Sequence, residues 1–200
     1  MDKDDIFKNL TKGTNLIHDH LVSNYNSDYL FNNCECNAHL IRDLTKIEEE
    51  YNNKWSSKLI ELLCNANDNY KDTVINFDEF DKKFDELITE GLSNYSINDY
   101  KKNNSEQILL NRLLKYKNNY TMFLKDLDIP FTNNLAERSL RMCKSKMKVS
   151  GQFKNLVYAE YYANIRSYIE TCIRFKINPY DALKKLQNNK PYTINELKNM

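Results

Sequence analysis

A single acid followed by a run of bases is the feature of this sequence most suited to chemistry. Glu137 is followed by six basic residues and no acid as far as Lys154. The six are Arg138, Arg141, Lys144, Lys146, Lys148 and Lys154. One carboxylate cannot neutralise six cations, so most of them are available for an external anion such as a phosphate. The carboxylate itself is of the type that binds Mg²⁺.

This stretch has the period of a helix. Pro130 ends whatever precedes it, and Thr132 or Asn133 can cap the helix N-terminus. The apolar stripe consists of Ala136, Leu140, Cys143 and Met147. The charged stripe, one residue further on, consists of Glu137, Arg141, Lys144 and Lys148. Because one residue turns a helix by about 100°, we expect the apolar stripe to be buried and the charged stripe to border it at the rim of a groove.

The same spacing has a simpler explanation. A Glu four residues before an Arg forms an ion pair on a helix surface, which stabilises the helix by only a few tenths of a kcal/mol. Spacing alone does not separate this pairing from a metal or phosphate site.

Composition predicts a largely helical chain of 200 residues, in one domain or two small ones. There are only three Gly and three Pro, and 41% of residues are hydrophobic. The net charge of +1 is unevenly divided. From Asn133 onward there are thirteen Lys and Arg against five Asp and Glu, a charge of +8, while the remainder carries −7. We therefore expect one local phosphate-facing surface.

The location predicted from sequence is the cytoplasm, with association with the nucleoid. No apolar run approaches the roughly 18 residues of a membrane span, and the N-terminal residues MDKDDIFKNL are acidic. Five cysteines are an odd number without secretory context, so reduced thiols are expected.

Elements are predicted from apolar periodicity and breaking residues. A strand over 15–19 would deliver His18 and Asp19 at its carboxyl end, where open α/β sheets build sites. The predicted helices are 37–63, Phe77–Leu92 with Gly91 as its cap, 105–127, the helix containing Glu137 as far as a break at Ser150 and Gly151, Leu156–Arg174, and a short final helix begun by Asn178 and Pro179. The segment 101–105 is predicted as an exposed turn.

Histidines and cysteines cluster near the N-terminus and allow a second kind of metal site. His18, His20 and His39 lie near Cys34 and Cys36, and these side chains are natural zinc ligands. No second cysteine pair follows, which is the wrong spacing for a closed structural site. Packed or surface side chains are the alternative interpretation.

Four stretches of this sequence resemble parts of a known family. The run NNLAERSLRMCKSKMKVSGQF, followed by IRSYIETCIRFKINPYDAL, resembles the C-terminal catalytic segment of the bacterial insertion-sequence-66 family of transposases. His18-Asp19 and the run CNAHLIRDL, which begins at Cys36, are similar to that family's middle acidic strand and its Cys-x-Ala-His motif. The resemblance covers nearly the whole chain and is weakest over 65–104.

The resemblance implies a DDE-type transposase, in which two Asp and one Glu hold Mg²⁺ or Mn²⁺ for DNA strand cleavage and transfer. The second Asp falls on Asp19 and the Glu on Glu137, and the basic residues 138–154 fall on the DNA-facing surface. The implied fold is mainly α with a small residual β part, an incomplete RNase H-like α/β fold carrying a helical insertion. The implied division is a strand region over 1–35, the insertion over about 37–128 and a catalytic helix region over 129–200.

The sequence departs from the family at the first catalytic Asp. Asp2, Asp4 and Asp5 lie in an acidic start without a strand, so the chain is expected to be the C-terminal part of a larger, here truncated, transposase. Its expected partners are the DNA of transposon ends and target, with a full-length transposase or accessory proteins of the same element, and no membrane. The alternatives are a non-catalytic DNA-binding or accessory remnant and a structural protein with a solvated basic face.

Overall fold

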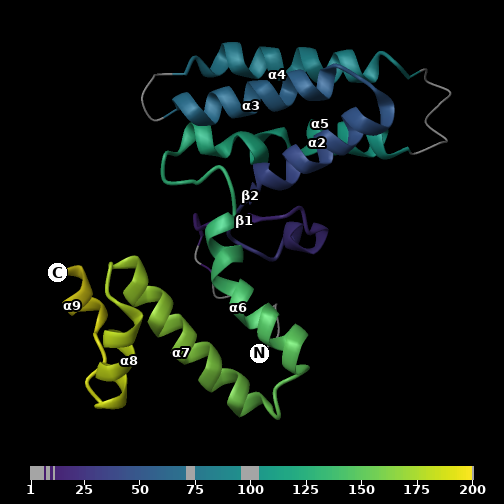
Figure 1. The fold of residues 1–200 in the computed structure, drawn as a ribbon. Helices are drawn as coiled ribbons and strands as arrows, with labels where there is room; N and C mark the ends of the chain where they lie inside the picture. The colour runs from purple at the N-terminus through teal and green to yellow at the C-terminus, as the bar shows by residue number, and fades with distance from the viewer. Residues whose placement is uncertain (1–6, 8–9, 11, 71–74, 96–103, 200) are drawn as a thin grey trace. The chain divides into compact units, whose positions relative to one another are not determined.

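The computed structural model describes residues 7, 10, 12–70, 75–95 and 104–199. The chain divides into two compact units, Met1–Asn134 and Leu135–Met200 (Figure 1). Each unit is described by itself below.

A two-stranded parallel sheet opens the first unit. β1 spans Asn15–His18 and β2 spans Asn32–Glu35. The register places His18 opposite Glu35, so the two strands end side by side. The strand predicted over 15–19 is confirmed, with Asp19 as the first residue beyond its carboxyl end.

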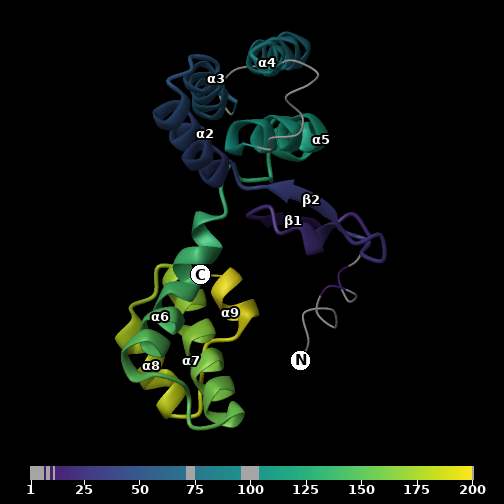
Figure 2. The same ribbon diagram turned by 90° about the vertical axis from the view of Figure 1, so that its right-hand side faces the viewer.

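Four helices pack on one another above this sheet. Besides the strands, the described residues of this unit form the 3-10 helix η1 (Val22–Tyr25), α2 (Asn37–Tyr51), α3 (Trp55–Asn69), α4 (Phe77–Leu92) and α5 (Ser105–Lys125). Helix α3 lies between α2 and α4, and α5 contacts α2, α4 and the strand β2 (Figure 2). The largest side chains of the resulting core are Trp55, Tyr120, Phe84 and Phe123, all almost fully buried.

The helix predicted over 37–63 is wrong, because the chain forms two helices there. Helix α2 stops where Asn52 adopts a left-handed conformation with φ of 49°. Asn is one of the few residues that adopts this conformation at little cost. The side chain of Asn53 then accepts a hydrogen bond from the Ser56 N–H at 3.2 Å as α3 begins. Apolar periodicity continues through both helices and does not reveal the break.

Gly91 does not cap α4, contrary to the prediction. The helix has the predicted bounds, but its C-cap is Ser93 and Gly91 is buried inside it. A Cβ atom on Gly91 would lie 2.7 Å from Leu110 Cδ2 and 3.0 Å from the Trp55 ring. The glycine therefore allows close packing of α4 against α3 and α5.

Helix α5 matches the helix predicted over 105–127 apart from its last two residues. The side chain of Asn104 caps it by accepting a hydrogen bond from the Gln107 N–H at 2.8 Å. The backbone leaves the helical conformation at Tyr116, where φ is −118° and ψ is 18°. Of the exposed turn predicted over 101–105, residues 101–103 lie outside the described residues.

The second unit consists of helices. They are α6 (Asn134–Ser150), α7 (Leu156–Arg174), α8 (Pro179–Gln187) and α9 (Ile194–Lys198). The predicted bounds of α7 are confirmed, as is the break after Ser150, where Gly151 has φ of 70°. Asn178 caps α8 as predicted, by accepting a hydrogen bond from the Tyr180 N–H at 2.8 Å. Helix α9 follows it, so α8 is not the final helix.

The buried apolar stripe predicted on α6 is wrong. No residue of α6 is buried, and Leu140 and Met147 are 55% and 54% exposed. The small core of this unit is formed instead by Cys172, Ala182 and Leu197 from α7, α8 and α9. Periodicity identifies residues that share a face of a helix, but it does not supply a partner that covers that face.

The described part of the chain is mainly helical, with 69% of its residues in helices and 4% in strands, as predicted. None of the helices in the described ranges combines the length and apolar content needed to cross a membrane.

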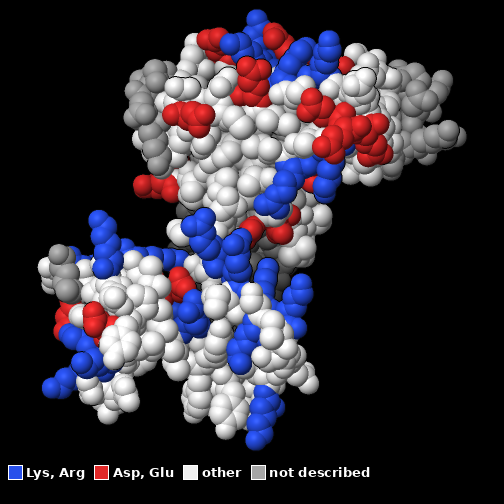
Figure 3. Space-filling model, viewed as in Figure 1, with Lys and Arg blue, Asp and Glu red and all other residues white. Residues whose placement is uncertain are grey.

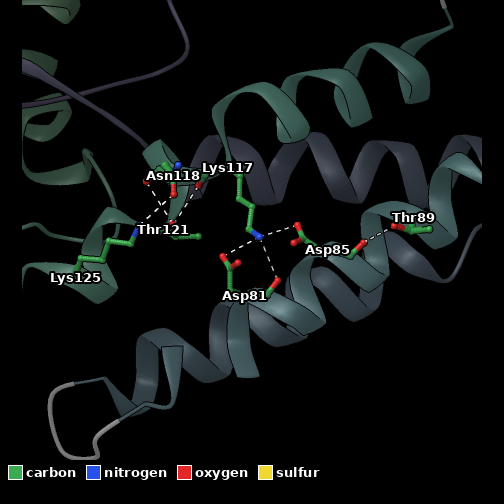
Figure 4. A network of polar contacts seen from close by, with 7 residues as sticks. All are labelled: Asp81, Asp85, Thr89, Lys117, Asn118, Thr121 and Lys125. Atoms are coloured by element: carbon green, nitrogen blue, oxygen red, sulfur yellow. Dashed lines mark hydrogen bonds and ion pairs between the residues drawn. The ribbon is translucent and has the colours of Figure 1, made fainter. Parts of the chain in front are cut away.

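An ion-pair network joins α4 to α5 in the first unit (Figure 4). Lys117 Nζ lies 2.8 Å from Asp81 Oδ1 and 2.6 Å from Asp85 Oδ1, and it also donates to the Asp81 carbonyl at 3.2 Å. Its side chain is only 16% exposed. Burial disfavours the charged amine, but the hydrogen bonds to the two carboxylates outweigh burial and raise the pKa of Lys117. The charged network therefore helps to hold α4 against α5.

Replacing Lys117 by Met should lower the free energy of unfolding by about 1 kcal/mol, because two carboxylates lose their partner while the apolar stem is kept. Denaturant titration measures this loss. The control Lys82→Met, whose side chain is 78% exposed, should change stability by less than about 0.5 kcal/mol. Because the folded-state pKa of Lys117 is raised, the difference between wild type and variant should be complete at neutral pH and shrink as pH rises through that pKa. Equal stability of wild type and Lys117→Met at neutral pH would contradict the assignment.

Candidate metal and nucleic-acid site

Asp19 stands exposed at the carboxyl end of β1, between two anchored histidines. His18 is only 6% exposed, and its Nε2 lies 2.9 Å from Asn33 Oδ1. His20 lies on the other side of Asp19, and its Nδ1 is 2.7 Å from Glu35 Oε1. Both neighbours of Asp19 are therefore tied to β2.

The Glu35 carboxylate is buried at the end of β2, with 1% of its side chain exposed. The Tyr25 hydroxyl donates a short hydrogen bond to the same Oε1 atom that His20 contacts. Burial first, and then this hydrogen bond to Glu35, raise the pKa of Tyr25 well above its usual range. The hydroxyl thus remains a proton donor, which a buried carboxylate needs.

Tyr116 of α5 covers this cluster. Its ring centroid lies 4.3 Å from that of Tyr25 and 5.0 Å from that of His20. The interruption of helical geometry in α5 occurs at this same residue. We name Glu35, His20, Tyr25 and Tyr116 the strand-end cluster.

Sequence reasoning missed this cluster. The sequence gives two signals of the cluster. Glu35 is an acid directly before Cys36 of the Cys-x-Ala-His motif, and His20 is the second histidine of His-Asp-His. Their meeting depends on the parallel register of β1 and β2, which neither segment encodes by itself.

Cys36 and Asn37, the first two residues of the Cys-x-Ala-His motif, link the end of β2 to α5 and to the segment before α6. Cys36 Sγ accepts a hydrogen bond from the Asn133 N–H at 3.2 Å. The Asn37 N–H donates to the Phe131 carbonyl at 3.1 Å, and its side-chain amide donates to the Tyr120 carbonyl at 3.0 Å. The segment that leads into α6 is therefore fixed beside the end of β2.

The zinc site considered for the histidines and cysteines is not formed by the described residues. Nowhere in residues 12–70, 75–95 and 104–199 do three His, Cys, Asp or Glu side chains gather in a group that could hold a metal ion. Cys34 is buried, and burial raises the pKa of its thiol to about 11, so it is protonated near neutral pH.

Glu137 lies in the first turn of α6 and is partly buried. Asp19 belongs to the first unit and Glu137 to the second, so their convergence on one metal site stays a prediction.

The six basic side chains after Glu137 are all exposed. They are Arg138, Arg141, Lys144, Lys146, Lys148 and Lys154. Within the described part of the chain, none of them forms a salt bridge; the ion pair of this unit joins Arg166 to Glu170 on α7. Lys and Arg side chains are spread over the visible face of the second unit, with few acids among them (Figure 3). A polyanion is the ligand that such a surface suits.

Comparison with known proteins supports the resemblance seen in the sequence. The family model described as Transposase IS66 family matches residues 4–161, which include Asp19, the strand-end cluster and all of α6. Searches of curated proteins and of solved structures gave no match. Because the family model covers most of its length, the chain belongs to the IS66 family of transposases.

Proposed function

We propose that this chain acts in DNA transposition, with Asp19 and Glu137 as metal-binding carboxylates for DNA strand cleavage and transfer. The observation that carries the proposal comes from α6: a carboxylate in its first turn is followed by exposed cations that form no salt bridge with any described residue. Membership in a transposase family supports DNA as the polyanion. The site of action would be the nucleoid.

The ligand chemistry suits a hard divalent cation. Asp19 and Glu137 offer carboxylate oxygens, which Mg²⁺ and Mn²⁺ prefer over the nitrogen and sulfur ligands of zinc. Asp19 is exposed at a strand end, and α6 begins one residue after Asn133, whose N–H is bonded beside the end of β2. A site shared by both carboxylates is what the resemblance to the family implies.

The two kinds of residue would have separate roles. Asp19 and Glu137 would hold divalent ions, which would supply an activated water or 3′-hydroxyl and stabilise the leaving oxygen. The exposed bases of α6 bind backbone phosphates and position the duplex without reading its sequence. The RNase H-like arrangement of the family is part of this proposal.

The carboxylate roles predict a selective loss of cleavage. Asp19→Asn and Glu137→Gln should each reduce Mg²⁺- or Mn²⁺-dependent nicking of supercoiled DNA by more than about 100-fold, because a lost ligand should cost at least as much as a lost supporting group. DNA affinity, measured by fluorescence anisotropy, should not fall, because a negative charge has been removed.

The matched controls are Asp28→Asn and Glu160→Gln, which replace exposed acids of the first and second unit. Both should nick DNA as the wild type does. Normal nicking by Glu137→Gln would refute its role. DNA binding by the wild-type chain without any nicking would favour the alternative, an accessory DNA-binding protein.

The basic surface predicts a reduced salt dependence of binding. Replacing Arg141, Lys144 and Lys148 together by Gln should weaken binding to duplexes of any sequence. It should also make the slope of log K against log salt concentration less steep by about 3, since each phosphate contact contributes about 0.9. Anisotropy titrations at several salt concentrations measure the slope.

The control for this experiment replaces three exposed lysines of the first unit, Lys46, Lys82 and Lys83, by Gln. It removes the same number of charges and should leave the slope within experimental error of the wild type. If both triple variants changed the slope equally, the effect would be one of net charge and not of a surface on α6.

A further inference from the structure

Asp19 occupies a turn whose backbone needs support. The next residue, His20, has φ of 58°. Residues with a side chain rarely adopt this left-handed conformation unless neighbouring contacts hold them there. The hydrogen bond from His20 Nδ1 to Glu35 is such a contact, at 2.7 Å.

The contact is held at three points. Glu35 is fixed in β2 by its pairing with His18, the residue before Asp19. Tyr25 donates to the same carboxylate oxygen from η1, the next element along the chain after β1. Tyr116 packs on both rings from α5. Asp19 is thus the exposed residue between two neighbours that are each bonded to β2.

We propose that Glu35 is a positioning residue for Asp19, which acts through His20 and Tyr25 to hold the Asp19 carboxylate in one orientation at the end of β1. A carboxylate accepts hydrogen bonds and cannot donate them, so His20 presents a protonated Nδ1 to Glu35. Oriented carboxylates bind metal more tightly, since less freedom is lost on binding. The metal-binding part of this inference depends on the proposed function, whereas the orientation of the turn does not.

The substitution Glu35→Gln tests the proposal by NMR of the full chain. In the wild type, the ¹⁵N signals of His20 should show a protonated Nδ1, and the Asp19 and His20 amides should have order parameters of about 0.85. In Glu35→Gln the Nδ1 proton should be lost from most molecules, and those order parameters should fall below about 0.6. The matched control Glu49→Gln changes an exposed acid on α2 and should match the wild type in both respects.

Addition of Mn²⁺ alone supplies the second measurement. Paramagnetic broadening of the Asp19 amide should require at least about tenfold more Mn²⁺ in Glu35→Gln than in the wild type. Broadening at equal Mn²⁺ in both proteins, with unchanged order parameters, would overturn the positioning role. Absence of broadening in the wild type would refute Asp19 as a metal ligand, and the signals of His20 and Asp19 would still decide whether Glu35 orients the turn.

A second variant covers the case in which Glu35→Gln does not fold. His20→Asn removes the imidazole but keeps a residue that tolerates the left-handed conformation. It should show the same fall in the Asp19 order parameter and the same tenfold weaker Mn²⁺ effect. An Asp19 amide as rigid as in the wild type would overturn the proposal.

Discussion

The parallel pairing of β1 with β2 is the constraint on which the candidate site depends. It sets His18 beside Glu35, so that residues seventeen positions apart in the sequence end their strands together. Parallel ladders place carboxyl ends at one edge, and this edge carries Asp19, His20 and the buried Glu35. A shift of one residue would exchange the two faces of β2 and remove Glu35 from His20.

A buried carboxylate at this position is costly unless it is fully hydrogen-bonded. Moving a charge out of water costs several kcal/mol. A hydrogen bond to a charged group stabilises the folded state by about 1.5–3 kcal/mol. Glu35 forms two such hydrogen bonds, with His20 and Tyr25, through one oxygen. The balance is close, so the cluster is better explained by its effect on the Asp19 turn than by a gain in stability.

The helices of the first unit support the strands. Helix α5 contacts β2, and the Asn119 side chain donates to the Asn33 carbonyl. Lys117 of the same helix forms ion pairs with Asp81 and Asp85 of α4. Helix α5 thus supports β2, and Asn37 of α2 holds the segment leading into α6 through its hydrogen bond to the Phe131 carbonyl.

Features that depend on residues within one helix could be predicted from the sequence, whereas features that depend on tertiary packing could not. The bounds of α7 and the capping of α8 by Asn178 follow from residues within one helix, and both were predicted. The split at Asn52, the burial of Gly91 and the exposure of the α6 stripe depend on which surface packs against which, and were not. For the site, residue types identified Asp19 and Glu137, whereas Glu35 needed the strand register.

Electrostatics follows the same division: composition alone located the excess of positive charge after Asn133, because net charge needs no knowledge of packing. What packing adds is that the bases of α6 are exposed and make no salt bridges with described residues, so their charge is available to a phosphate backbone, while the acids of α4 are partly neutralised within the first unit by Lys117.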